Sequence, residues 1–87
     1  MREDIQYEIL DYLSRYPNAR DSAEGIMTWW LSRDTEVTLP EVEEALSELV
    51  RLRWINRAGE GKAQSYGLEN AAMKEIRTYL AKEKKRG

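Results

Sequence analysis

Apolar residues recur at helical spacing in four stretches of the chain, and this pattern predicts helices near residues 3–16, 21–31, 39–52 and 70–84. In the third stretch the spacing is i, i+3, i+4 and i+7, which places the apolar side chains on one helical face. These side chains are Val42, Ala45, Leu46 and Leu49. The last stretch carries a similar stripe, formed by Ala72, Met73, Ile76, Tyr79 and Leu80.

Capping residues mark where three of these helices begin. Thr38 precedes the third helix and Glu41 stands three residues later, a spacing that predicts a capping box. Asp21 and Glu24 have the same spacing and predict a second capping box at the start of the second helix. Asn70 is the expected cap of the last helix.

After the third helix the spacing of apolar residues changes from helical to alternating, and this change predicts a β-hairpin. Ile55, Tyr66 and Leu68 stand at alternating positions of two short segments, residues 54–58 and 63–68, as a hairpin with one buried face requires. The linker between them contains two glycines, which supply the positive φ values of a turn. An isolated hairpin is marginally stable in water, so the helices must cover its apolar face.

The composition agrees with one small globular domain and excludes several kinds of chemistry. Of the 87 residues, 41% are hydrophobic and 34% are charged, and we predict a single α+β domain, mainly helical, over residues 1–87. Cysteine and histidine are both absent, which excludes disulfides, thiolate nucleophiles, Cys/His zinc sites and Ser-His-Asp triads. No Gly-rich phosphate loop or Asp-rich metal loop accompanies the acidic residues. We therefore expect no enzymatic activity, no cofactor and no metal.

Targeting and membrane signals are also missing from the sequence. No apolar run approaches the roughly 18 residues that a membrane span needs. The N-terminus lacks the basic and then apolar pattern of a signal peptide. The expectation is a cytoplasmic protein with no membrane contact.

Charge is divided unevenly along the chain. Residues 1–50 carry 4 basic and 12 acidic side chains, whereas residues 51–87 carry 10 basic and 4 acidic ones. The two halves therefore have net charges of −8 and +6, although the whole chain has only −2. Such a division favours an oppositely charged partner or self-association, unless the two halves neutralise each other within the fold.

The order of helices and hairpin resembles that of winged helix-turn-helix domains. The spacing of the apolar residues after Thr38 resembles the recognition-helix-to-wing junction of MarR- and PadR-type bacterial regulators. These residues are Val42, Ala45, Leu46, Leu49, Val50, Trp54 and Ile55. The run Tyr66-Gly67-Leu68-Glu69-Asn70 resembles the end of their wing.

The resemblance implies a winged helix: a three-helix core, a β-hairpin wing at about 54–68 and a C-terminal closing helix at about 70–84. A basic tail follows at 82–87. Arg53 stands where these regulators usually have a glycine. The resemblance therefore implies that Arg53 adopts a positive φ, or that the exit of the third helix is remodelled.

In the regulators the third helix lies in the DNA major groove, but its outward-facing residues in this chain are mostly acidic. By position these residues are Glu41, Glu43, Glu44, Ser47, Glu48 and Arg51, and four of the six are glutamates. Phosphate contacts need Lys or Arg, so four carboxylates facing a polyanion are unfavourable. We therefore interpret the face as a protein-docking surface, with Glu41, Glu44 and Glu48 as candidates. The alternative is a solvated surface without a partner.

DNA binding by a transcriptional regulator is the alternative function. Its candidate contacts lie on the third helix, the wing and the basic tail. They are Ser47, Arg51, Arg57, Lys62, Gln64, Lys84, Lys85 and Arg86. The tail also has a local explanation, because basic side chains complement the negative C-terminal end of a helix.

Two apolar features have more than one interpretation. Trp30 falls on the buried face of the second helix, whereas Trp29 points about 90° away from that face. Trp29 either packs against the first or last helix or anchors a protein partner. The apolar stripe of the last helix packs on the domain, on a second copy of the chain or on both. We predict homodimerisation through this stripe, with Met73, Ile76 and Leu80 as the candidate dimer surface.

Overall fold

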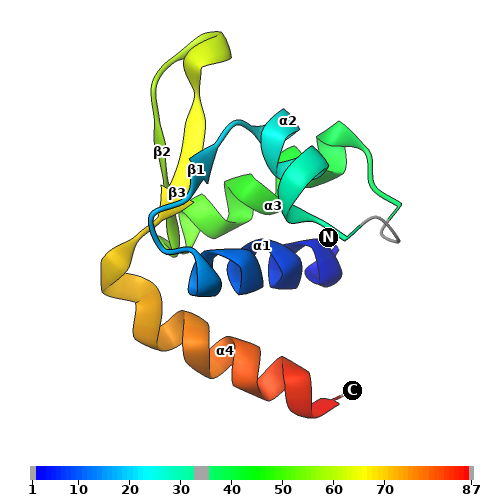
Figure 1. Ribbon diagram of the computed structural model, residues 1–87, viewed down its shortest axis with the longest axis vertical. Helices are drawn as coiled ribbons and strands as arrows, with labels where there is room; N and C mark the ends of the chain where they lie inside the picture. The colour runs from blue at the N-terminus through cyan, green and yellow to red at the C-terminus, as the bar shows by residue number, and fades with distance from the viewer. Residues whose placement is uncertain (1, 33–35, 87) are drawn as a thin grey trace.

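The computed structural model describes residues 2–32 and 36–86, and the side chains of Lys62 and of residues 84–86 lie outside this description. The fold is α+β and mainly helical, with a small antiparallel sheet (Figure 1). The helices are α1 (Glu3–Arg15), α2 (Ala23–Gly25) with its π-helical continuation η1 (Ile26–Trp30), α3 (Leu39–Arg51) and α4 (Met73–Arg86). The strands are β1 (Arg20–Asp21), β2 (Ile55–Ala58) and β3 (Ser65–Leu68), and short 3-10 turns are η2 (Gly61–Ala63) and η3 (Asn70–Ala72). The predicted helices and hairpin are confirmed, with shifted starts for the second and last helices.

The sheet has the strand order β1-β3-β2, and both pairings are antiparallel. In the predicted hairpin, Ile55 pairs with Leu68 and Arg57 with Tyr66. The strand β1 was not predicted, because two residues are too short for a period-2 pattern. The helical spacing instead predicted that the second helix begins at Asp21, directly after Arg20.

Arg20 joins all three strands across a glycine. It pairs with Gly67 in the sheet, and a Cβ at Gly67 would lie 2.4 Å from the Arg20 Nη1 atom. Because Gly67 has no side chain, the guanidinium crosses β3, donating from Nε to Ser65 Oγ at 2.9 Å and from Nη2 to the Asn56 carbonyl at 3.5 Å. This crossing ties the short strand β1 to the hairpin.

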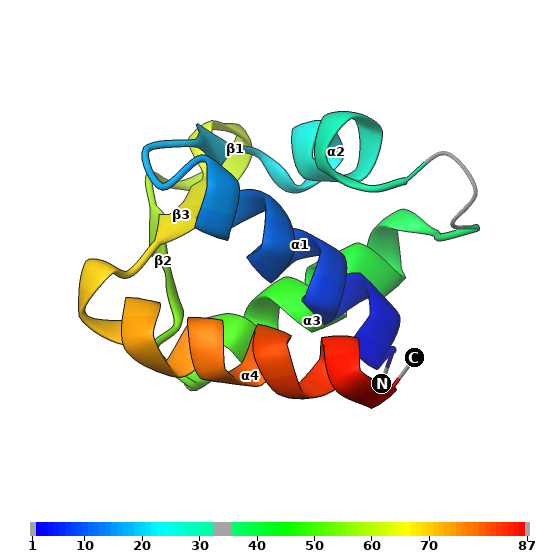
Figure 2. The same ribbon diagram turned by 60° about the horizontal axis from the view of Figure 1, so that its bottom comes forward.

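One apolar core lies between α1, α3, η1, the sheet and α4. Fully buried side chains come from all four helical segments; they are Ile5, Ile9, Leu10, Leu13, Ile26, Val42, Leu46, Leu49 and Ile76. The ring of Trp30 stacks on Tyr12 with centroids 4.6 Å apart, which confirms Trp30 as the core tryptophan. α4 packs on α1, on the side of the domain opposite α2 and the hairpin tip (Figures 1 and 2).

Two predicted helix caps are wrong. The second helix is capped by Ser22, whose Oγ accepts from the Gly25 N–H at 3.1 Å. Asp21 is held extended by its pairing with Tyr66, and its carboxylate accepts from the Ser22 N–H at 2.8 Å instead. Asn70 is not a cap either, because the backbone already turns there into η3 and α4 begins three residues later.

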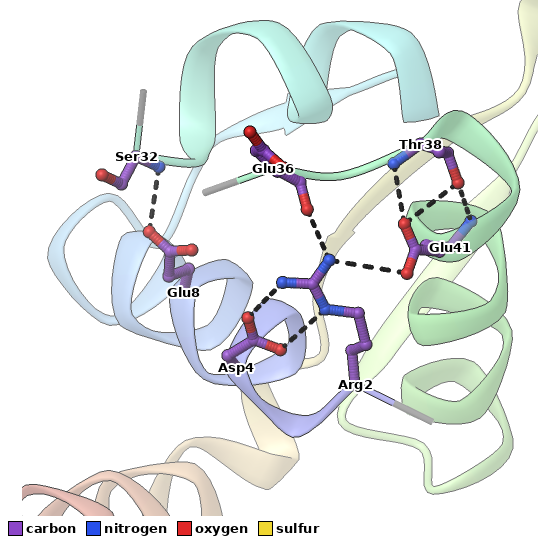
Figure 3. A network of polar contacts seen from close by, with 7 residues as sticks. All are labelled: Arg2, Asp4, Glu8, Ser32, Glu36, Thr38 and Glu41. Carbon is purple, nitrogen blue, oxygen red and sulfur yellow. Dashed lines mark hydrogen bonds and ion pairs between the residues drawn. The ribbon is translucent and has the colours of Figure 1, made fainter. Parts of the chain in front are cut away.

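The capping box of α3 is confirmed and is joined to the start of α1 (Figure 3). Thr38 N–H donates to Glu41 Oε1 at 3.0 Å, and Glu41 N–H donates to Thr38 Oγ1 at 3.4 Å. The guanidinium of Arg2 donates to both carboxylate oxygens of Asp4, to the Glu36 carbonyl and, at 3.5 Å, to Glu41 Oε2. One cation therefore connects the first turns of two helices that are distant in sequence.

The exit of α3 has the geometry of a Schellman motif. Arg53 has φ of 63°, which confirms the predicted left-handed conformation. The Trp54 N–H donates to the Leu49 carbonyl at 3.1 Å, and the Arg53 N–H donates to the Val50 carbonyl at 2.9 Å. Over the described residues, no helix combines the length and apolar character needed to cross a bilayer.

The Schellman motif predicts that Arg53→Gly is neutral or stabilising by up to about 1 kcal/mol, because glycine adopts a positive φ without strain. Glu43→Gly is the control. Glu43 is exposed in the interior of α3, where the change to glycine should cost roughly 0.5–1 kcal/mol. Urea unfolding of both variants measures the two effects. A loss of stability in Arg53→Gly as large as that in the control would contradict the prediction.

The Arg2 network predicts a loss of stability in acid. Hydrogen bonds from Thr38 and the nearby Arg2 lower the pKa of Glu41 below its ordinary value of 4.5, and the Arg2 hydrogen bond lowers the pKa of Asp4 below 3.8. Since the pKa of each carboxyl is lower in the folded state than in the unfolded state, the network stabilises the fold at pH values above the ordinary carboxyl pKa. This stabilisation is lost as the pH falls through the depressed values.

Arg2→Met should therefore flatten the pH dependence of the unfolding free energy between about pH 5 and pH 3. Arg15→Met is the control, because Arg15 is exposed and its ion pair among the described residues is with Asp11, one turn earlier in the same helix. The measurement is urea unfolding at a series of pH values. Equal slopes in Arg2→Met and the unmodified chain would show that the network does not act in this way.

Candidate functional site

The outward face of α3 is acidic, as its sequence predicted. Glu43, Glu44 and Ser47 are exposed, and the apolar stripe on the opposite side is buried. The helix cannot rotate about its axis without exposing that stripe. Its acidic residues are therefore held at the surface.

Arg51 is the basic residue of this face, and its charge is offset within the helix. Its Nε donates to Glu48 Oε2 at 2.9 Å, and its Nη2 forms a second bond to Glu48 Oε1. This bidentate ion pair lowers the pKa of the Glu48 carboxyl and raises the pKa of Arg51. α3 therefore presents an acidic surface whose one guanidinium is already bound.

Glu41 stabilises the start of α3 through contacts within the chain. Its carboxylate accepts from Thr38 and Arg2 in the network described above. All three glutamates singled out on α3 have polar contacts; those of Glu41 are with Thr38 and Arg2, and those of Glu48 are with Arg51. Glu44 is exposed at the surface, next to Glu43.

Trp29 is 74% exposed. The interpretation that it packs against the first or last helix is therefore wrong. Consecutive residues of a helix point in different directions, and the neighbouring Trp30 occupies the core and is only 8% exposed. A large apolar side chain is left in solvent on η1.

A small acidic groove lies between the start of α2, the start of α3 and the hairpin. Its volume is about 110 Å³. It is lined by Ser22, Ala23, Glu24, Leu39, Glu43, Gly61, Gln64 and Tyr66. Two exposed carboxylates, Glu24 and Glu43, lie at this groove, and none of its described lining residues is basic. From the sequence, Glu24 was interpreted only as part of a capping box, so the groove that it lines together with Glu43 was not predicted.

The structure describes the side chains of only some of the residues proposed for DNA contact. The guanidinium of Arg57 lies 5.6 Å above the ring centroid of Tyr66. Gln64 lines the acidic groove, and Ser47 is exposed on α3. The side chains of Lys62, Lys84, Lys85 and Arg86 lie outside the described residues. Arg51 on the helix and Arg57 on the hairpin thus both contact side chains of the same chain.

The apolar stripe of α4 is turned inward. Ile76 is fully buried, Leu80 is 9% exposed and Met73 is half-buried, all against the rest of the domain. These candidate dimer residues therefore do not form an exposed surface in the single chain. The outer side of α4 carries exposed Lys74, Arg77 and Lys82 instead.

A larger groove on another face was not predicted. It has a volume of about 600 Å³ and runs between the exit of α3 and the start of α4. Leu52, Trp54 and Ala72 line it, and Leu52 is 40% exposed. The sequence showed Leu52 only as a flank of the α3 stripe, and in the structure it lies just past the last residue of α3, Arg51.

No three His, Cys, Asp or Glu side chains of the described residues lie close enough together to hold a metal ion. Searches against protein-family models, curated proteins and solved structures find no match to this chain. The site must therefore be interpreted from its own geometry and charge.

The two adjacent tryptophans predict opposite effects on stability. Trp29→Ala should change the free energy of unfolding by no more than about 0.5 kcal/mol, because the side chain lies in solvent. Trp30→Ala should cost about 3–5 kcal/mol, because it removes a buried ring that stacks on Tyr12. Urea unfolding measures both. A large loss in Trp29→Ala would show that this side chain is buried in solution.

Proposed function

We propose that this chain is a winged-helix module that acts by docking protein rather than by catalysis or by reading DNA. Two features support the fold assignment. The elements follow the order α1, β1, α2, α3, β2, β3, and the hairpin closes a sheet of order β1-β3-β2. In this proposal α3 is the recognition helix, the β2–β3 hairpin is the wing and α4 is the closing helix.

The observation that carries the proposal is the charge of α3. Glu43 and Glu44 are exposed on its outward face, and the guanidinium of Arg51 is bound to Glu48. A polyanion approaching this helix meets carboxylates, and a DNA complex would have to break the Arg51–Glu48 pair to gain one cation. A basic protein surface meets the opposite situation and is attracted.

Trp29 supports the protein-docking proposal independently of charge. Exposed tryptophans are common energetic centres of protein interfaces, because a rigid aromatic ring buries a large area at low entropic cost. At 74% exposure, Trp29 has most of its surface available for such burial. It makes a candidate anchor with no evident role in the core.

The proposal predicts that the unmodified chain binds a random duplex more weakly than about 10⁻⁴ M at physiological salt, the weak limit of ordinary non-specific binding. It should bind a labelled octalysine peptide more tightly than the duplex. Glu43→Gln/Glu44→Gln/Glu48→Gln should reverse this order, because it removes three carboxylates and frees Arg51. The freed cation should steepen the salt dependence of duplex binding by nearly one unit.

Fluorescence anisotropy with both probes over a salt series tests this. The control variant is Glu3→Gln/Glu36→Gln/Glu60→Gln, which changes the net charge equally at exposed positions outside α3. Tight, sequence-dependent duplex binding by the unmodified chain would overturn the proposal in favour of a DNA-binding regulator. An equal response of the control variant would show that only net charge matters.

A further inference from the structure

We propose that the partner docked at the acidic groove is a second copy of this chain, which presents the basic outer side of its α4. This inference rests on the proposed function and names its partner. The contact joins two different surfaces, so each copy uses its groove for one neighbour and its α4 for another. Such a heterologous contact builds a chain or ring of copies rather than a two-fold dimer.

The acidic partner surface is available for an intermolecular contact. Glu24 and Glu43 are exposed, and neither forms an ion pair within the described part of the chain. The groove is also lined by Ala23 and Leu39 and by Tyr66, whose ring lies under the guanidinium of Arg57. A cationic side chain entering here can place its aliphatic stem against Ala23 and Leu39 and its charge near the carboxylates.

The basic partner surface is equally available. Lys74, Arg77 and Lys82 are exposed on α4, and none of them has an ion pair among the described residues. Lys74 and Lys82 line one groove, which Glu75 also lines, and Arg77 lies round the helix toward α1, at a groove with Asp11. The three cations span roughly 12 Å along the helix. The inner side of the same helix is committed to the core through Ile76 and Leu80.

The two surfaces cannot meet within one molecule. α4 packs on α1 on the side of the domain opposite α2 and the hairpin tip, and α1 and α3 lie between (Figures 1 and 2). Glu24 and Glu43 are therefore separated in space from the basic residues of α4. In this proposal, the groove and the basic residues of α4 meet between copies. The net charge of −2 leaves little overall repulsion to oppose their approach.

Sedimentation velocity at high micromolar concentration tests the proposal at two ionic strengths. At about 0.01 M the Debye length is about 30 Å and the unmodified chain should form a concentration-dependent series larger than a dimer; at about 1 M, where it is about 3 Å, the chain should be monomeric. Glu24→Gln/Glu43→Gln and Lys74→Gln/Arg77→Gln/Lys82→Gln should each weaken association at least tenfold. The control Glu3→Gln/Glu36→Gln should not.

Mixing the two surface variants gives the sharpest outcome. The first retains an intact α4 side and the second an intact groove, so an equimolar mixture should form dimers and stop there. Urea unfolding midpoints close to that of the unmodified chain confirm that both variants are folded. A two-fold dimer built from the same two surfaces would also regain one contact on mixing, but its unmodified chain would stop at a dimer instead of forming larger species.

A strict monomer at low ionic strength would overturn this inference, as would association that survives both variants. The second result would point to another surface, such as the groove beside Leu52. Neither result affects the duplex titration. If the chain is monomeric and also fails to bind duplex, only the self-docking inference falls, whereas tight duplex binding removes the proposed function itself.

Discussion

The orientation of α3 is the constraint on which the rest of the molecule depends. Its apolar stripe must face the core, and both of its ends are held by specific hydrogen bonds. The capping box and Arg2 fix its start, and the Schellman turn at Arg53 fixes its exit. With the helix held at both ends and along one side, its charged face has one direction left, outward into solvent. The surface chemistry of the domain follows from this geometry.

The charges on that outward face do not all have the same role. Glu41 stabilises the helix start, and Glu48 holds Arg51. Glu43 and Glu44 are exposed beside them, and Glu43 meets Glu24 of another helix at the acidic groove. The face therefore combines residues that maintain the fold with Glu43, which is exposed to a partner. A substitution at Glu41 would test stability, whereas one at Glu43 would test docking.

Surface charge of this kind controls which partner approaches more than how tightly it is held. Exposed ion pairs contribute little each, and complementary fields mainly raise the encounter rate and exclude wrong partners. Affinity comes from buried apolar area, which the exposed ring of Trp29 can supply. In the proposed module, the carboxylates select a basic partner, and burial of apolar side chains supplies the binding free energy.

The sequence by itself determined the elements whose signals are local. The α3 capping box, the alternation of Ile55, Tyr66 and Leu68, and the choice of Trp30 for the core all follow from spacings within one segment. The tertiary structure alone decided what depends on distant segments. Pairing with β3 made Arg20 and Asp21 a strand and moved the helix cap to Ser22. Packing on α1 buried Ile76 and Leu80, and the meeting of α2 with α3 brought Glu24 beside Glu43. Periodicity shows which side of an element is apolar, but the neighbour that covers it, and the charges that then meet, are set only when the whole chain is packed.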